Sequence, residues 1–179
     1  HGGSASRAID GIIDGNWQRG SVTHTCGSGS PWWMVDLGSN AHVTSVLVYN
    51  RNDCCDDRLD GTYLEILDED DNIVASQRFE GVKNVYHFSF ANVVGRFVKV
   101  NRKQWGDINI AEVEVYGTSI VLPVESLAPT TKPTLSLVPT IWEPKNIITD
   151  NAVATQDSTC HGGSASRAID GIIDGNWQR

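Results

Sequence analysis

Residues 51–58 read Arg-Asn-Asp-Cys-Cys-Asp-Asp-Arg, and His24 precedes them with twenty-six residues between it and Arg51. Two guanidinium groups and an imidazole that meet at one surface point offer several N–H donors in fixed directions. Asp53 is available to orient the guanidinium groups and to limit their mutual repulsion. Because the neighbouring hydroxyl groups of a sugar suit such donors, the pattern predicts a carbohydrate site on the exposed surface.

The pattern His-x26-Arg-x-Asp-x4-Arg, with adjacent cysteines inside its last gap, resembles the fucose-binding signature of the F-type lectins, or fucolectins. Other stretches that resemble this family are residues 5–11, 20–25, 31–37 and 110–117. The resemblance covers about residues 1–117 and the segment 147–160. It implies a lectin that binds terminal L-fucose or a similar 6-deoxy sugar on fucosylated glycans.

The resemblance also implies roles for the site residues. Arg51 and Arg58 would donate hydrogen bonds to sugar hydroxyls and to the ring oxygen, and His24 would contact an axial hydroxyl. Trp17 would contact a methyl group or apolar face of the sugar, although a place in the core is an equal alternative. Any one of these residues alone would be ordinary solvated surface, so the prediction depends on their spacing.

The four cysteines, Cys26, Cys54, Cys55 and Cys160, allow three pairings if all are oxidised. Geometry argues against a bond between neighbours, since adjacent Cα atoms lie about 3.8 Å apart and ordinary disulfides need about 4.4–6.8 Å. The resemblance implies the opposite, a Cys54–Cys55 disulfide under the sugar ring, with Cys26 paired to the Cys160 equivalent of a preceding repeat. Either pairing predicts an oxidising, extracellular compartment and a secreted protein.

A structural calcium ion is the cofactor that the resemblance implies. The ligands carried over are the carbonyl oxygens of Arg7, Ile12 and Ala111 and the side chains of Asp10, Ser21 and Glu112. Such oxygen ligands suit Ca²⁺. Ile12 stands where family members often have asparagine, so one side-chain oxygen is lost. The alternative is that Asp10 only caps a turn and that Glu112 is an exposed strand residue.

The rest of residues 1–117 predicts an all-β sandwich, because short apolar stretches alternate with Gly, Asn and Asp. The expected strands are residues 33–37, 43–49, 62–67, 73–79, 85–90, 95–101 and 111–116. Trp32 and Trp33 open the first of them and are expected to be structural. The acidic run 68–72 is expected to be a solvated hairpin turn and not a metal site. The resemblance implies an eight-stranded jelly roll with binding loops at one end.

A repeat ends the chain: residues 161–179 match residues 1–19 letter for letter, with a period of 160 residues. Chance does not produce such identity, and a natural tandem array is favoured over an engineered duplication. Residues 146–160 resemble the first strand of an F-type lectin domain. The predicted parts are therefore a lectin domain without its N-terminal strand, residues 1–117, a Pro/Thr-rich spacer, 118–145, and the start of the next repeat, 146–179.

The spacer and the open sheet edge together predict an assembly. Proline at this density favours extended chain, but the spacer is also too apolar to be a freely solvated tether, so part of it is expected to dock. A missing strand leaves an adhesive edge. We therefore expect residues 147–179 to pack on a lectin body other than residues 1–117 of the same chain, giving head-to-tail contacts between copies and a filament.

Composition excludes several classes of function. A net charge of −8 and a pI of about 4.9 argue against nucleic acid and anionic membranes, since both require clustered Lys and Arg. No apolar window approaches a membrane span, and no signal peptide is visible. Hydrolase elbows, paired metal histidines and phosphate-binding loops are missing, so an enzyme is least expected. The alternatives are an extracellular fibre protein and a discoidin-type domain. Discoidin-type domains are marked by apolar residues on their binding loops, whereas the corresponding loops of this sequence carry the sugar motif.

Overall fold

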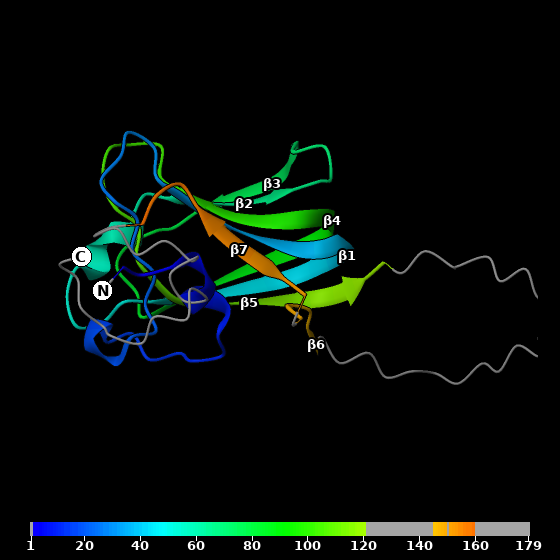
Figure 1. Cartoon of the computed structure of the whole chain (residues 1–179). Coiled ribbons are helices and arrows are strands. Elements are labelled where there is room, and N and C mark those ends of the chain that lie inside the picture. The colour runs from blue at the N-terminus through cyan, green and yellow to red at the C-terminus, as the bar shows by residue number, and fades with distance from the viewer. Residues whose placement is uncertain (1, 121–144, 150, 160–179) are drawn as a thin grey trace, which may run out of the picture.

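The computed structural model describes residues 2–120, 145–149 and 151–159. Its elements are η1 (Ala5–Ile9), η2 (Trp17–Arg19), β1 (Trp32–Asn50), η3 (Asp56–Leu59), β2 (Tyr63–Leu67), β3 (Ile73–Arg78), β4 (Val85–Asn101), β5 (Ile110–Ser119), β6 (Lys145–Asn146) and β7 (Val153–Gln156). The strands follow the order β3-β2-β4-β1-β5-β6, with β7 on β1 (Figure 1). The predicted all-β class is confirmed. Within these ranges no helix has the length and apolar character needed to cross a membrane.

The two longest strands, β1 and β4, run from one end of the sandwich to the other and back (Figure 1). The first part of β1, residues 32–36, pairs with residues 97–101 of β4, and the part after residue 41 pairs with residues 85–95. The neighbours change at the bend, because β7 lies on the first part of β1 and β5 lies on the second. The loops before and after β1 therefore meet at the same end of the molecule.

The bends account for the main error in the predicted strands. Gly38 has a φ of 83° and Asn92 a φ of 55°, so both lie in the left-handed region. Register shifts between β1 and β4 show that these positions are irregularities inside continuous strands. The expected separate strands on either side of each bend are one strand each. The described residues therefore hold seven strands, where the resemblance implied eight.

Side chains of both halves of the bent sheet form one core. Trp33 is fully buried, and its Nε1 donates to the carbonyl oxygen of Ala5 at 2.9 Å, which ties η1 to the sheet. Phe79 contacts Tyr86 and Phe88 edge to face, with centroids 4.8 and 4.7 Å apart. The structural role predicted for Trp33 is thus confirmed.

The acidic run 68–72 is the predicted hairpin turn, between β2 and β3. Asp68 Oδ1 accepts the backbone N–H groups of Asp70 and Asn72, each at 2.9 Å. Asp71 supplies the left-handed residue of the turn, with a φ of 63°. The acidic side chains therefore belong to turn geometry.

Residues 145–149 and 151–159 complete the sandwich of residues 2–120 of the same chain. Strand β6 pairs with β5, and Ile147, 7% exposed, enters the core with its N–H bonded to the Val115 carbonyl at 2.7 Å. Strand β7 pairs antiparallel with β1 at residues 33–36 and crosses the sandwich beside it (Figure 1).

The prediction that this segment packs on a different lectin body is wrong for its described residues. A strand tethered to the same chain has a high effective concentration at the open edge, so it fills that edge before another copy can. Strand β5 also continues to Ser119, two residues into the predicted spacer. The spacer residues 121–144, Cys160 and the repeated residues 161–179 lie outside the described residues.

Replacing Ile147 by Ala should lower the free energy of unfolding by about 2–5 kcal/mol, because it removes buried apolar volume and leaves a cavity. The matched control is Val153→Ala on β7, where a 59% exposed side chain should change the free energy by about 0.5 kcal/mol or less. Urea denaturation of the full chain, at concentrations where ultracentrifugation finds a monomer, measures both. Equal stabilities of the two variants would contradict closure within one chain.

Candidate functional site

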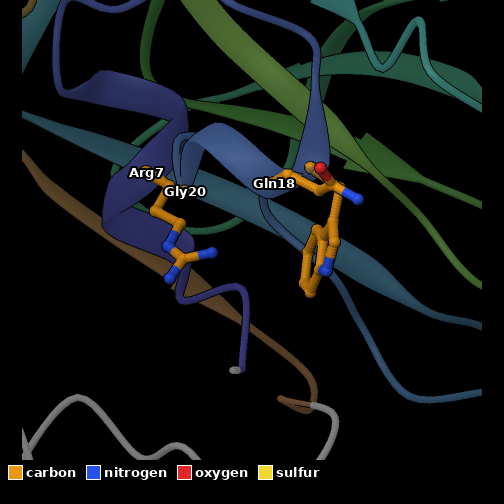
Figure 2. Close-up of a pocket in the computed structure, with 4 residues that line it drawn as sticks. Arg7, Gln18 and Gly20 are labelled. Carbon is orange, nitrogen blue, oxygen red and sulfur yellow. The ribbon is translucent and has the colours of Figure 1, made fainter. Parts of the chain in front are cut away.

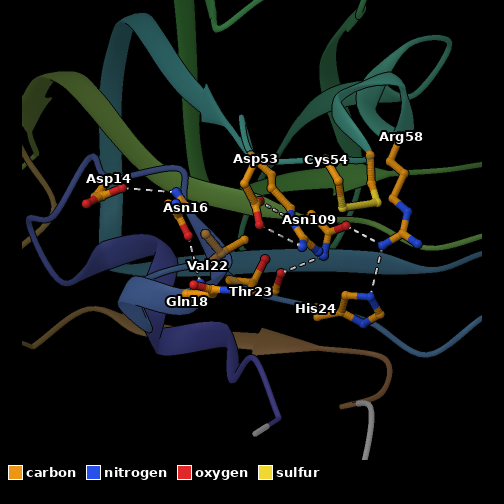
Figure 3. Close-up of polar contacts among 12 residues, drawn as sticks. Asp14, Asn16, Gln18, Val22, Thr23, His24, Asp53, Cys54, Arg58 and Asn109 are labelled. Atoms are coloured by element: carbon orange, nitrogen blue, oxygen red, sulfur yellow. Dashed lines mark hydrogen bonds and ion pairs between the residues drawn. A yellow bond between two sulfur atoms is a disulfide. The ribbon is translucent and has the colours of Figure 1, made fainter.

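The predicted sugar-binding side chains meet at the end of the sandwich where β1 starts and ends. His24 lies on the loop before β1, Arg51 directly follows β1, and Arg58 belongs to η3. Arg58 Nη1 lies 2.9 Å from His24 Nε2 (Figure 3). The bend of β1 explains how residues so far apart in sequence form one site, since the strand leaves this end and returns to it.

Arg51 is held by a carboxylate and an indole. Its Nε and Nη2 donate to the two oxygens of Asp53 at 2.7 and 3.2 Å. Its guanidinium carbon lies 5.1 Å from the centroid of the Trp17 ring, within range of a cation–π contact. The hydrogen bond from Arg51 is the largest cause that lowers the pKa of Asp53, and the backbone N–H of Trp17 lowers it further. Asp53 thus has the predicted orienting position, but toward Arg51 only.

Arg58 is oriented by two residues that sequence reasoning missed. Its Nη1 also donates to Asn109 Oδ1, and its Nη2 lies 3.1 Å from Asp107 Oδ2. Asn109 is fully buried and donates to the Thr23 carbonyl at 2.9 Å. The alternation of polar and apolar residues from Asp107 to Ile110 puts Asp107 and Asn109 on one face. Nothing in the sequence indicates that this face meets Arg58.

His24 is neutral in this environment. Burial is the largest cause that lowers its pKa, and the positive charges of Arg58 and Arg51 lower it further, while Asp107 opposes them. With Nε2 accepting the Arg58 N–H, the remaining proton is assigned to Nδ1, which has no hydrogen-bond partner among the described residues. The Trp17 ring stands edge-on to the imidazole, with centroids 5.5 Å apart. A neutral histidine allows the two guanidinium groups to lie close to it.

Neither arginine is freely exposed. Arg51 is 8% exposed, because it follows the buried end of β1 and is covered by Trp17 and Asp53, and the Arg58 side chain is 25% exposed. Some donors nevertheless stay unused. Among the described residues, neither Arg51 Nη1 nor Arg58 Nε makes a hydrogen bond. These groups are oriented by protein contacts and are available to a ligand.

Cys54 and Cys55 are joined by a disulfide beside Arg58 (Figure 3). The expectation from Cα spacing alone is therefore wrong, and the one from the family resemblance holds. Cys55 has a φ of 58°, a left-handed conformation that turns the chain into η3, and Cys54 is exposed. The bonded sulfurs form an apolar patch at the rim of the site. Cys26 has no disulfide partner among the described residues, and Cys160 lies outside them.

The loop that carries His24 is held by the far end of the chain. Gln156 Nε2 donates to the His24 carbonyl at 3.3 Å, and Ser158 Oγ accepts the N–H of Cys26 at 2.9 Å. Asp157 accepts from Ser28 Oγ at 2.8 Å. The segment after the spacer therefore positions the site as well as completing the sheet.

Trp17 borders a pocket of about 290 Å³ on the surface of η2, together with Arg7, Gln18 and Gly20 (Figure 2). The guanidinium carbon of Arg7 lies 5.8 Å from the indole centroid. Trp17 is half-buried and contacts Arg51 and His24. Trp17 therefore lies beside the predicted sugar-binding residues and not in the core, and its contact with a sugar stays a prediction.

Most of the predicted calcium ligands form a second group beside the site. Ser21 Oγ donates to Asp10 Oδ2 at 2.6 Å and lies 3.3 Å from the Ile12 carbonyl oxygen. Glu112 Oε1 accepts the Gly11 N–H at 3.2 Å. Asp10 Oδ1 also accepts the Ile12 N–H at 2.9 Å, so Asp10 does cap a turn, as the alternative proposed.

Glu112 is 4% exposed, so the alternative of an exposed strand residue is wrong. Burial is the largest cause that raises its pKa to about 7, and the charge of Asp10 adds to it. Its Oε2 is buried without a partner among the described residues. Ala111 falls in a register shift of β5 against β1, and Arg7 lies in η1. The described residues hold no group of three or more His, Cys, Asp or Glu side chains that could share a metal ion.

Comparison with known proteins agrees with this geometry. A family model described as "NedA-like, galactose-binding domain" matches residues 7–100. Fucolectin from Anguilla anguilla is 34% identical over 119 residues, which cover 62% of this chain and 75% of that protein. The lectin domain of lectinolysin, solved with Lewis B antigen, is 36% identical with a TM-score of 0.62, over 65% of this chain and 86% of that one. A Streptococcus pneumoniae fucose binding module is 35% identical with a TM-score of 0.61, over 63% and 82%.

These relatives are lectins and sugar-binding modules, in agreement with the prediction that the chain is a binding protein and not an enzyme. The region that the family model matches includes β1, β2, β3, most of β4 and the loops that carry His24, Arg51 and Arg58. By its sequence and its fold, the chain belongs to the fucolectin family of F-type lectins.

Proposed function

We propose that this protein binds terminal L-fucose, or a similar 6-deoxy sugar, on fucosylated glycans. The observation that carries the proposal is the pair of guanidinium groups, each fixed by a carboxylate, that gather with a neutral histidine at one end of the sandwich. Donors that are oriented before binding lose little conformational entropy when a ligand arrives. The fucolectin and the fucose binding module among the relatives support the choice of sugar.

The unused N–H groups of Arg51 and Arg58 would donate to neighbouring hydroxyls and to the ring oxygen. The disulfide of Cys54 and Cys55 and the indole of Trp17 supply apolar surfaces at the same end of the molecule. A methyl group loses nothing against such a surface, whereas a hydroxymethyl group leaves a hydroxyl without a partner. This difference favours a 6-deoxy sugar.

We further propose that the group around Asp10 and Glu112 holds a structural Ca²⁺. The donor set is two carboxylates, the Ser21 hydroxyl and backbone carbonyl oxygens, all of the hard type that this ion prefers. The cation would supply the partner that the buried Glu112 Oε2 lacks and would offset the repulsion from Asp10. The ion would thereby tie the loop before His24 to β5.

The exact repeat supports an extracellular tandem array of such domains, with neighbouring copies joined through the chain itself. A shallow site for one solvated sugar binds with a dissociation constant of about 10⁻⁴ M or weaker, so repeated sites would supply avidity. The vicinal disulfide supports an oxidising compartment. A fibre protein that uses the sandwich only as a building block is the alternative, and its assembly would not need the sugar site.

Replacing Arg51 or Arg58 by Ala should abolish detectable binding to fucose-agarose, because each change removes oriented donors and leaves a carboxylate unpaired. Lysine at either position should fail as well, since it lacks the planar fork. The matched control is Arg96→Ala, which removes an arginine at the opposite end of the sandwich, where it pairs with Asp36. Retention of fucose binding by Arg51→Ala would show that the sugar binds elsewhere.

Sugar affinity should be constant at and above pH 6.5, the ordinary pKa of histidine, and should fall only at a lower pH, where the folded protein takes up a proton at His24. The pKa of His24 is lowered in the folded state, so protonation begins only at a lower pH and then removes the acceptor of the Arg58 N–H. The unfolded chain binds that proton more readily, so the contribution of His24 to the free energy of unfolding also falls below pH 6.5, whereas Glu112, whose pKa is raised, contributes in the opposite direction. Calorimetric titration from pH 8 to pH 5 (roughly the range in which histidine changes charge) tests this. An affinity that rises on acidification would contradict a neutral His24.

Calcium at about one hundred times its dissociation constant should raise the melting temperature by about 5 °C or more, and EDTA should reverse the change. Glu112→Gln should remove the effect, because it removes the buried carboxylate. Asp68→Asn, in the acidic hairpin turn, is the control and should respond to calcium like the unaltered chain. Thermal denaturation with and without the ion decides the matter, and a response that persists in Glu112→Gln would contradict the assignment.

A further inference from the structure

The loop between β4 and β5 presents an indole that the site described above does not use. Trp105 is 75% exposed, more than any other large apolar side chain among the described residues. A Cβ atom at Gly27 would lie only 3.1 Å from its ring, so the indole rests on the backbone of the loop that carries His24. A side chain at Gly27 would displace it. The ring thus lies against the bare backbone three residues after His24.

The loop of Trp105 is joined both to the loop that carries His24 and to Arg58. Ser28 and Gly106 exchange two backbone hydrogen bonds of 3.1 Å, which join the two loops on either side of the indole. Arg102 Nη1 donates to the Arg58 carbonyl at 2.6 Å, and Asp107 pairs with the Arg58 side chain. Figure 1 shows the two loops side by side at the site end of the sandwich.

A single exposed apolar side chain on a protein surface needs no function. Trp105 differs because its loop is held at three points and because Asp107, two residues further along the same loop, orients Arg58. An indole offers a large, rigid apolar face at small conformational cost. The apolar C–H face of a pyranose ring fits such a surface, whereas the hydrogen-bonding groups of Arg51 and Arg58 fit hydroxyls.

We propose that Trp105 forms a second subsite, which stacks on the sugar to which the terminal fucose is linked. The ligand class is therefore a fucosylated oligosaccharide and not the free monosaccharide. The inference rests on the proposed function, because it requires fucose at Arg51 and Arg58. Trp105 is then a specificity-determining residue: it adds affinity only when a second ring is present.

The test compares two probes, methyl α-L-fucoside and a fucosyl-galactose disaccharide, by calorimetric titration of the full chain. Trp105→Ala should weaken disaccharide binding by about threefold to tenfold, the range of one aromatic stacking contact, and should leave the fucoside within about twofold. Trp105→Phe should retain most of the disaccharide affinity. Ile73→Ala, another exposed apolar residue, which lies at the far end of the sandwich, is the control and should bind both probes normally.

Saturation-transfer NMR gives a second readout. In the unaltered chain, protons of both sugars should receive saturation, and in Trp105→Ala only those of the fucose should. Equal disaccharide affinity in Trp105→Ala and the unaltered chain would overturn the subsite, and so would an equal loss for both probes, which would put Trp105 in the fucose site itself. Failure of the unaltered chain to bind the fucoside would overturn the proposed function. Under the proposal, Arg51→Ala should lose binding of the fucoside, whereas Trp105→Ala should keep it.

Discussion

The site depends on the contacts that the Arg58 side chain makes with three other side chains. One guanidinium group meets a histidine from the loop before β1, and a carboxylate and an amide from the loop before β5, and its backbone carbonyl receives Arg102. The guanidinium groups of Arg51 and Arg102 lie close by. This end of the protein therefore gathers positive charge, although the chain is acidic overall. The carboxylates of Asp53 and Asp107 offset this positive charge, and His24 adds none because it is neutral. The same carboxylates orient the donors before any ligand arrives.

That contact is possible only because β1 and β4 bend. Each strand leaves the site end, turns at a left-handed residue and returns, so the segments before and after it are neighbours. The bends serve the core and the site at once: the two halves of each strand enclose the buried side chains, and their ends deliver the loops. A sheet without these irregularities would carry His24 and Arg51 to opposite ends.

Sequence reasoning recovered the all-β class, the hairpin at residues 68–72 and the structural role of Trp33, because alternation and turn residues are local signals. It divided β1 and β4 at Gly38 and Asn92, since a left-handed residue looks the same in a bulge and in a turn. It missed Asp107 and Asn109, because their partner is fifty residues away and no local pattern names it. Adjacent cysteines were judged correctly only through family resemblance, since Cα spacing alone excludes what a left-handed turn allows.

The closing segment has a consequence for the length of an array. Gly117 pairs with Lys145, so the described chain on either side of residues 121–144 starts and ends at one place on the sheet. In a tandem array, the part of the chain between these two ends would therefore add nothing to the distance between successive domains while β6 stays paired with β5. Under tension, an array would lengthen only when β7 leaves β1 and then β6 leaves β5, since β7 lies nearer the next repeat along the chain, and about 3 Å would be released for every residue freed. Because Gln156 and Ser158 also hold the loop of His24, stretching of this kind would reach the sugar site as well.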